Sequence, residues 1–271
     1  MNDAMLVKRI IKQAAVIKDQ IIVIKLPTII IDNEKLLTNF AQNVQLLNLS
    51  GARVVIVHEY ESVVADRLRE LSGVQDLESS HFGQDKLSEF VEMIISGRIN
   101  RDIVARLCAN AVQAVGISGK DGHLVIAKKS KVVTKKPTGI YDASYIGEPM
   151  LVNPEILLSY NGSDIIFVVS PIACNEKGRT VIMDPDSTVS MIAASVGADH
   201  LIMLGDEDFL TRNEIKVGDE AGLQKIIENS SEVLADCQAI RAARYALKHA
   251  ECFVHFSDAT KIDALLLSLF G

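Results

Sequence analysis

The first fifty residues of the chain contain no glycine, and the whole chain contains no tryptophan. The missing glycines matter where a buried strand ends, because a glycine-rich turn there lets backbone amides hold a phosphate group. An apolar strand over residues 21–24 runs into Lys25-Leu26-Pro27-Thr28, and a second over residues 54–57 runs into His58-Glu59-Tyr60-Glu61. Neither turn has the composition of a phosphate-binding loop.

The few cysteines and the modest excess of acidic residues argue against several classes of protein. The four cysteines are widely spaced, which argues against a disulfide framework and against paired metal ligands. A net charge of −7 argues against a nucleic-acid partner. The apolar runs are strand-length and the N-terminal segment lacks the pattern of a signal peptide. We therefore expect a cytoplasmic protein that binds no membrane.

Apolar strands alternate with amphipathic helices along most of the chain. The spacing of apolar residues predicts helices over residues 3–18, 34–49, 62–71, 84–96, 100–110, 187–197, 219–229, 232–249 and 260–269. Strands are expected over residues 53–58, 112–117, 165–169, 180–183, 200–204 and 252–256, with a hairpin-like region over 123–153. This order predicts an α/β fold with a mostly parallel sheet covered by helices on both faces, a three-layer αβα sandwich.

Two common nucleotide-binding signatures are incomplete in the sequence. Residues 116–122 look like a Walker loop, but Ala114 stands in place of the leading glycine and Asp121 in place of the magnesium-binding Ser or Thr. The first strand is not followed by a G-x-G-x-x-G segment, which argues against a dinucleotide site there. The pattern at residues 116–122 predicts a turn.

Several segments together resemble N-acetylglutamate kinase, a member of the amino-acid kinase family. They are residues 22–25, 91–100, 114–122 and the stretch from Gly147-Glu148 through Asn153-Pro154-Glu155. The resemblance implies an N-terminal helix (1–20), an N-terminal lobe for the acylamino acid (21–190) and a C-terminal lobe for the nucleotide (191–271). The reaction it implies belongs to arginine biosynthesis: ATP, with Mg²⁺, phosphorylates the side-chain carboxylate of N-acetyl-L-glutamate.

The resemblance also assigns roles to residues. Lys25 stands where a lysine reaches the transferred phosphoryl group, and Asp186 stands where an aspartate organises the site. Substrate-binding positions fall on His58, His81 and Asp184, a nucleotide-binding position falls on Asp206, and no residue is assigned as a direct metal ligand. Taken alone, Lys25 is equally typical of a strand-end lysine that reaches solvent, and Asp186 of a helix N-cap.

Other positions depart from the family pattern. Pro27-Thr28 replaces a glycine pair, and Glu59-Tyr60-Glu61 replaces three glycines, so two carboxylates would face an anion site. His81 replaces an arginine, and Asp208 replaces a glycine. Because residues 235–241 contain no lysine where a second essential one is expected, and Arg241 would lie on another helix face, we expect catalysis to be severely weakened or lost.

Three functions stay open from the sequence. The chain is a working kinase, a non-catalytic regulatory or ligand-binding homologue, or a protein of the same fold that uses Glu59, Glu61, Asp184 and Asp208 for a cationic ligand or a metal. The N-terminal helix resembles one that joins dimers into hexamers in arginine-inhibited members of the family. We therefore expect a homo-oligomer whose ligand is an acylamino acid or an arginine-like effector.

Overall fold

A seven-stranded sheet forms the centre of the molecule, in the order β10-β11-β9-β1-β2-β6-β3. The computed structural model describes residues 12, 14–72, 84–129, 146–159, 164–205, 215–228 and 237–270. The strands of the sheet are β1 (Ile21–Leu26), β2 (Arg53–His58), β3 (Gln113–Ser118), β6 (Ile165–Ser170), β9 (His200–Gly205), β10 (Ile215–Val217) and β11 (Phe253–Asp258). Within the described residues, β10 pairs antiparallel with β11 and the other neighbours pair parallel, which confirms the expected mostly parallel sheet.

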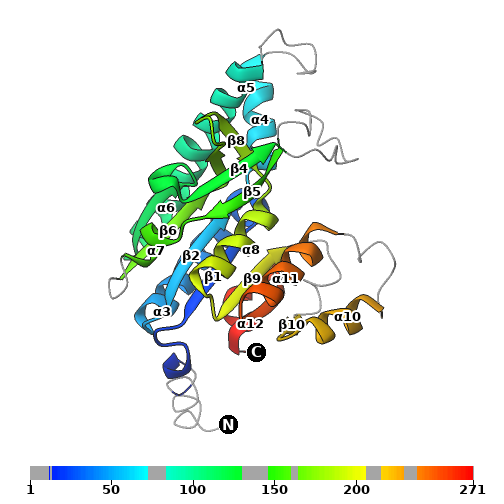
Figure 1. Ribbon diagram of the computed structural model, residues 1–271. Coiled ribbons are helices and arrows are strands. Elements are labelled where there is room, and N and C mark those ends of the chain that lie inside the picture. Colours follow the sequence, from blue (N-terminus) through cyan, green and yellow to red (C-terminus); the bar gives the residue numbers. More distant parts are fainter. Residues whose placement is uncertain are drawn as a thin grey trace.

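Helices cover both faces of this sheet, as Figure 1 shows. Buried residues of α3 (Glu34–Leu49), α6 (Asn100–Ala109) and α12 (Ala264–Phe270) pack on one face. Buried residues of α8 (Pro185–Val196), α10 (Glu220–Glu228) and α11 (Gln238–His249) pack on the other. Because side chains alternate along a strand, Ile22 and Ile24 join the first layer and Val23 joins the second. The expected three-layer αβα sandwich is confirmed.

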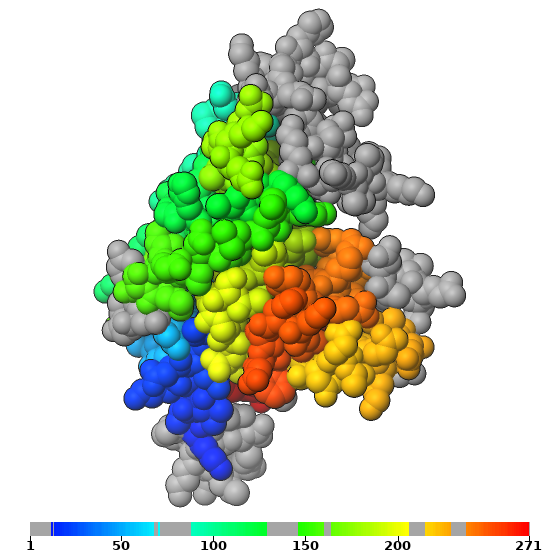
Figure 2. Space-filling view, viewed as in Figure 1, coloured from blue at the N-terminus to red at the C-terminus, as the bar shows by residue number. Residues whose placement is uncertain are grey.

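A smaller four-stranded sheet, closed in the order β4-β5-β8-β7, sits at one end of the molecule. Its strands are β4 (Val125–Lys129), β5 (Ile146–Val152), β7 (Ile172–Cys174) and β8 (Thr180–Met183). β4 and β5 pair antiparallel, as the hairpin-like region predicted. Helix α8 follows β8 directly and lies between β5 and α11, an arrangement visible on the face shown in Figure 2.

Further helical segments follow individual strands of the two sheets. A short helix α2 (Thr28–Ile31) follows β1, α4 (Glu61–Ser72) follows β2, and α7 (Glu155–Leu158) follows β5. α5 (Gln84–Glu92) continues through a π-helix (Met93–Ile99) into α6, where the sequence pattern predicted two separate helices. The wider π-helical turns keep the chain helical across Gly97.

Some expectations fall on residues that the structure does not describe. Of the helix expected over residues 3–18, the structure describes residues 12 and 14–18, and residues 12 and 14–16 are helical; His81, Asp206 and Asp208 lie outside the described residues. The boundary expected between the two lobes falls inside α8, and β1 of the first lobe pairs with β9 of the second. In the described part of the chain, no helix combines the length and apolar character that crossing a membrane requires.

Candidate active site around Lys25

Lys25 lies near the carboxyl end of β1 and points toward α8. It follows Val23 in the alternation of the strand, so its side chain leaves the sheet on the face that α8 covers. The side chain is only 10% exposed, and Lys25 Nζ lies 2.7 Å from Oδ1 of Asp186 in the first turn of α8. The two residues predicted to be catalytic are therefore in direct contact.

Glu59, the first residue after β2, also binds Lys25. Its Oε1 lies 3.0 Å from Lys25 Nζ, and its Oε2 accepts a 3.1 Å hydrogen bond from the backbone N–H of Thr28. The parallel pairing of β1 and β2 brings these two strand ends together. The Glu59 carboxylate thus contacts both the lysine and the first free amide of the turn after β1, the two kinds of group that bind an anion at such a turn.

The charge of Lys25 is fixed by its two partners. Burial opposes the charged form of the lysine, but the ion pairs with Asp186 and Glu59 outweigh it and raise the pKa of Lys25. The lysine is a permanent cation at physiological pH. Its ammonium group is already neutralised by two carboxylates of the same chain.

Two more carboxyl groups stand beside this triad. Burial, and after it the negative charge of Glu59, raises the pKa of Glu61 to about 7. Asp184 is the N-cap of α8, where its Oδ2 accepts a 2.7 Å hydrogen bond from the N–H of Ser187. Burial and the neighbouring Asp186 raise the pKa of Asp184 as well. The site therefore groups four carboxyl groups around one lysine.

Gln238, the first residue of α11, completes the cluster, and the sequence pattern did not single it out. Its Nε2 donates to Asp184 Oδ2 at 2.8 Å and to Ser187 Oγ at 2.7 Å. Arg241 turns back and donates from Nε to Gln238 Oε1 at 3.1 Å. From the region where a second lysine was expected, a neutral amide reaches the site. The helix expected over residues 232–249 placed Gln238 inside the helix, whereas α11 begins at Gln238, so the sequence carried no signal for its role.

His58 ends β2 on the opposite face of the sheet from Lys25. Its ring is completely buried, with Nδ1 2.9 Å from Glu59 O and Nε2 3.3 Å from Asn100 Nδ2. The amide of Asn100 must donate to Nε2, so Nδ1 carries the proton and donates to the carbonyl of Glu59. Burial lowers the pKa of His58 to about 4, and the ring is neutral. Its hydrogen bonds position the backbone of Glu59.

Gly116 on β3 leaves the space that the side chains of Asn100 and Arg101 occupy next to His58. A Cβ atom at Gly116 would lie 1.9 Å from Asn100 Oδ1 and 2.2 Å from Arg101 Nη2. Arg101 Nη2 in turn donates to Asn100 Oδ1 at 2.6 Å and fixes the amide. The glycine that suggested a Walker loop therefore serves packing behind His58. Of the turn predicted over residues 116–122, residues 116–118 belong to β3, and only the part from residue 119 onward forms a turn, which leads into the 3₁₀ helix Asp121–His123.

The predicted site residues divide into three groups in the structure. Lys25, Asp184 and Asp186 come together, His58 lies behind them on the other face, and His81 and Asp206 fall outside the described residues. Among the described residues, no group of three or more His, Cys, Asp or Glu side chains could hold a metal ion. The carboxylates nearest Lys25 are bonded to Lys25, Thr28, Ser187 and Gln238 instead.

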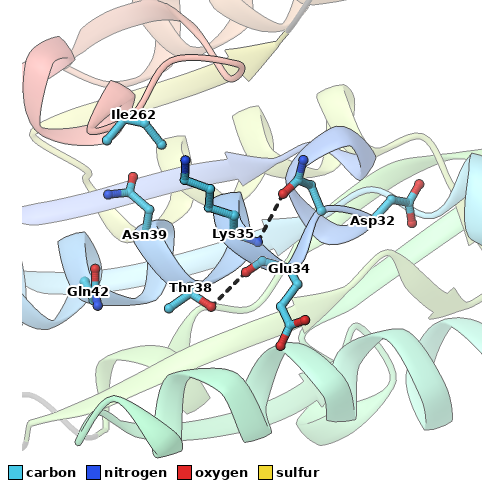
Figure 3. Close-up of a pocket in the computed structure, with 8 residues that line it drawn as sticks. Asp32, Glu34, Lys35, Thr38, Asn39, Gln42 and Ile262 are labelled. Atoms are coloured by element: carbon cyan, nitrogen blue, oxygen red, sulfur yellow. Dashed lines mark hydrogen bonds between the residues drawn. The ribbon is translucent and has the colours of Figure 1, made fainter.

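A separate groove of about 920 Å³ runs along α3, as Figure 3 shows. It is lined by Asp32, Asn33, Glu34, Lys35, Thr38, Asn39, Gln42 and Ile262. Its polar groups are largely used within the protein: Asp32 accepts from Ser62 Oγ at 2.6 Å, and Asn39 Nδ2 donates to Asp263 Oδ1 at 2.8 Å. The groove shares no residue with the Lys25 cluster, and we place the candidate active site at Lys25.

A sequence model of the amino acid kinase family matches residues 20–251. The chain belongs to the amino acid kinase family. It is 30% identical over 251 residues to the acetylglutamate kinase of Archaeoglobus fulgidus, covering 88% of this chain and 85% of that protein. The acetylglutamate kinase of Parvibaculum lavamentivorans is 35% identical over 179 residues, but that match covers only 64% of this chain and 59% of that protein. The resemblance to N-acetylglutamate kinase is confirmed at the level of the family.

Solved structures of the N-acetylglutamate synthase of Neisseria gonorrhoeae share the fold of this amino acid kinase homologue. The complex with coenzyme A and N-acetyl-glutamate superposes with a TM-score of 0.76 at 19% identity, covering 100% of this chain and 61% of that chain. The complex with coenzyme A and L-arginine gives a TM-score of 0.72 at 16% identity, covering 100% and 63%. Likeness at this identity shows the amino-acid kinase fold.

Proposed function

We propose that this protein is an acetylglutamate kinase homologue in which ATP-dependent phosphorylation of N-acetylglutamate is severely weakened or lost. The observation that carries the proposal is the position of Glu59. Its carboxylate is bonded to Lys25 Nζ and to the N–H of Thr28, so an anion at this turn would have to displace it. Phosphoryl transfer depends on positioned positive charge facing the phosphoryl oxygens, and a neutralised lysine offers little.

The rest of the cluster adds to the same effect. Glu61 and Asp184 place further carboxyl groups beside Lys25, where they repel a polyanionic nucleotide. Gln238 contributes an amide where a cation is expected, and Pro27 has no backbone N–H to offer. Each of these differences removes attraction for phosphate.

ATP with Mg²⁺ is the phosphoryl donor that membership of the family implies. The described residues fit it poorly, because the oxygens of Glu59, Asp184 and Asp186 are bonded to donors of the same chain. Lys25 is the described cation that would face the phosphate, and Asp206 is assigned to the nucleotide by the family resemblance alone. We propose that Mg-ATP binds weakly.

The role that remains is ligand binding without turnover. The family context and the arginine-bound synthase of Neisseria gonorrhoeae support an acylamino acid or an arginine-like effector as the ligand. We include in the proposal a cytoplasmic homo-oligomer, joined in part through the N-terminal segment. Light scattering tests the assembly, and a rise in melting temperature with arginine or N-acetylglutamate tests the ligand. A monomer that none of these ligands stabilises would contradict this role.

The loss of catalysis is tested by trapping the acyl phosphate with hydroxylamine. The chain and the acetylglutamate kinase of Archaeoglobus fulgidus are assayed side by side with N-acetylglutamate and Mg-ATP, each near its optimal temperature. We expect this chain to be slower by about 10³-fold or more, since a lost charge-stabilising group commonly costs 10²- to 10³-fold. Rates within a factor of about 10 of each other would refute the proposal.

A gain-of-function variant tests the cause. Glu59→Gly combined with Gln238→Lys leaves Lys25 paired with Asp186 alone, frees the Thr28 amide and adds a second cation at the start of α11. We expect tighter binding of Mg-ATP, seen as a larger thermal shift, together with an increase in hydroxamate formation. Glu251→Gly, at an exposed position before β11, is the matched control. No change in nucleotide binding, in a variant that melts cooperatively, would show that Glu59 is not the block.

A cationic ligand is the second candidate, favoured by the excess of carboxyl groups over cations in the cluster. Glu61 has a pKa of about 7 and so carries part of its charge at neutral pH. A bound amine or guanidinium would favour its charged form. Thermal shifts with a panel of amines and divalent ions, compared between the wild type and Glu61→Gln, measure this. If neither protein responds, the second candidate is rejected.

A further inference from the structure

Two buried histidines, His200 and His255, lie at the amino-terminal ends of the central strands, away from Lys25. His200 begins β9 and pairs with Ile22 at the start of β1, while His255 lies on the adjacent strand β11. Their rings are in contact, with His200 Nδ1 2.9 Å from His255 Nε2. The candidate active site uses neither residue.

The two rings are the middle of a chain of three hydrogen-bond contacts. At one end, His200 Nε2 lies 3.1 Å from Oε1 of Gln20, the residue that precedes β1. At the other end, His255 Nδ1 lies 2.7 Å from the carbonyl oxygen of Ser268 in α12. The chain therefore links the start of β1, through β9 and β11, to the C-terminal helix.

Counting protons shows that these three contacts cannot all be hydrogen bonds while both rings are neutral. A carbonyl oxygen only accepts, so three hydrogen bonds between two terminal oxygens require three ring N–H protons. Two neutral imidazoles carry two. In the neutral pair, His255 Nδ1–H donates to Ser268 O, His200 Nδ1–H donates to His255 Nε2, and His200 Nε2 has no proton. Gln20 must then turn its amide so that its NH₂ group faces His200.

One added proton completes the chain without any rotation. Protonated on Nε2, His200 donates directly to Gln20 Oε1, and the other two hydrogen bonds are kept. A second proton can be placed only on His255 Nε2, where it faces His200 Nδ1–H across 2.9 Å. Two N–H groups cannot share that contact, so the second proton breaks the pair.

Charged groups on the neighbouring strands act on the pair in opposite directions. Asp199, beside His200 on β9, favours protonation, whereas Lys216 on β10 disfavours it. Phe253 on β11 stacks on His200 with ring centroids 5.9 Å apart, and Lys216 Nζ lies 4.6 Å from the centre of the same phenyl ring. The thiol of Cys252, the residue before β11, is buried. Among the described residues, Asp199 and Lys216 are the charges that set the balance.

We propose that Gln20, His200, His255 and Ser268 form a proton-controlled latch that holds the start of β1 and the C-terminal helix α12 against the sheet. The first proton switches the Gln20 amide from donor to acceptor and leaves the latch closed. The second proton opens it between the two rings. The break separates Gln20 and His200 from His255, which keeps its hydrogen bond to Ser268 O. Helix α12, whose Ala264 and Leu265 are buried against the first helical layer, thereby loses its link to the start of β1.

The pH range of the latch follows from its environment. Burial lowers the pKa of His200 to about 4 and that of His255 to about 3, below the 6.5 of a free histidine. A histidine whose folded pKa is lowered adds stability that is present above pH 6.5 and is lost as the pH falls toward the folded pKa. The latch is therefore closed and neutral at pH 7, and it opens under acid conditions.

Histidine ¹⁵N NMR of the full chain tests the tautomers, and hydrogen exchange tests the opening. At pH 7 we expect both rings neutral, His255 protonated at Nδ1, and protected amides in α12. Near pH 3, where the second proton binds, we expect exchange in α12 to accelerate before global unfolding. A neutral His255 with its proton on Nε2, or α12 exchange that changes with pH only when the whole protein unfolds, would overturn the proposal.

Substitutions at Gln20 test whether its contact with His200, and not burial alone, sets the titration of the histidine pair. Gln20→Glu places a carboxylate against His200 Nε2, so the first titration midpoint should rise by about 1 pH unit or more. Gln20→Leu removes the acceptor and should lower that midpoint. His249→Gln, at an exposed histidine on α11, is the control and should leave both values unchanged. If Gln20→Glu and Gln20→Leu titrate alike, Gln20 is not part of the latch.

Discussion

Replacing Glu61 by glutamine should stabilise the protein at alkaline pH and have little effect under acid conditions. In the folded protein, burial and the charge of Glu59 raise the pKa of Glu61 from 4.5 to about 7. A difference of one unit between the folded and unfolded pKa values corresponds to about 1.4 kcal/mol, so the ionised side chain lowers the free energy of unfolding by about 3 kcal/mol at high pH. Partial solvent exposure of Glu61 reduces the expected cost to about 2 kcal/mol.

The sign of this effect follows from proton binding. Between pH 4.5 and 7 the folded state holds a proton on Glu61 that the unfolded state has lost, so stability falls across this range and the full cost of Glu61 is reached above pH 7. Glutamine has the same shape, stays neutral, and can still accept the hydrogen bond that Tyr60 N–H makes to Glu61 Oε2 at 3.3 Å. It removes the charge and keeps the contact.

Urea denaturation of the wild type and of Glu61→Gln at pH 8.5 and pH 5 measures this difference. We expect the variant to be more stable by about 2 kcal/mol at pH 8.5 and by less than about 1 kcal/mol at pH 5. Glu251→Gln, at an exposed position, should show no difference at either pH. A destabilised variant at pH 8.5, or a gain of the same size at both values, would refute our account of the carboxylate cluster.

Two further predictions concern the network behind His58. Because the folded pKa of His58 is about 4, the stability that neutral His58 contributes is present above pH 6.5 and is lost as the pH falls. Between pH 7 and pH 5 the free energy of unfolding should therefore fall by about 2 kcal/mol less in His58→Gln than in the wild type. Denaturation at both pH values measures this loss, and a slope equal to that of His249→Gln would contradict it. Gly116→Ala should destabilise by about 1 to 3 kcal/mol, since its Cβ would lie 1.9 Å from Asn100 Oδ1. Thermal unfolding should show no comparable loss for Gly97→Ala, whose Cβ would meet no atom within 4 Å, and equal effects of the two substitutions would count against the packing role of Gly116.

Most of the fold could be predicted from the sequence because its strands are apolar throughout and its helices are strongly periodic. The helix expected over residues 34–49 is α3 (Glu34–Leu49), capped by Asn33, whose side chain accepts from Lys35 N and Leu36 N. β10 was missed because three residues carry too little periodicity, and its antiparallel place is set by pairing with β11. The π-helix was missed because its pattern matches that of an ordinary helix.

The site was predictable in its retained residues and less so in its new contacts. The family resemblance pointed to Lys25, Asp184 and Asp186, and the structure brings them together. The contact of Gln238 with Asp184 joins residues 54 positions apart, and no local pattern encodes it. The sequence also gave no reason to place His58 behind the sheet, since only the alternation of β2 and its packing on α6 decide the face.

The substitutions at the ends of β1 and β2 compensate one another. A buried lysine or backbone N–H left without an acceptor costs about 1 to 3 kcal/mol or more, so these donors need acceptors from within the chain when no anion is bound. Glu59 accepts from both Lys25 Nζ and Thr28 N–H, and Pro27 removes a donor at the same turn. The positive charge of Lys25 is therefore balanced by Glu59 and Asp186 of the same chain, and the turns after β1 and β2 supply acceptors to each other's donors.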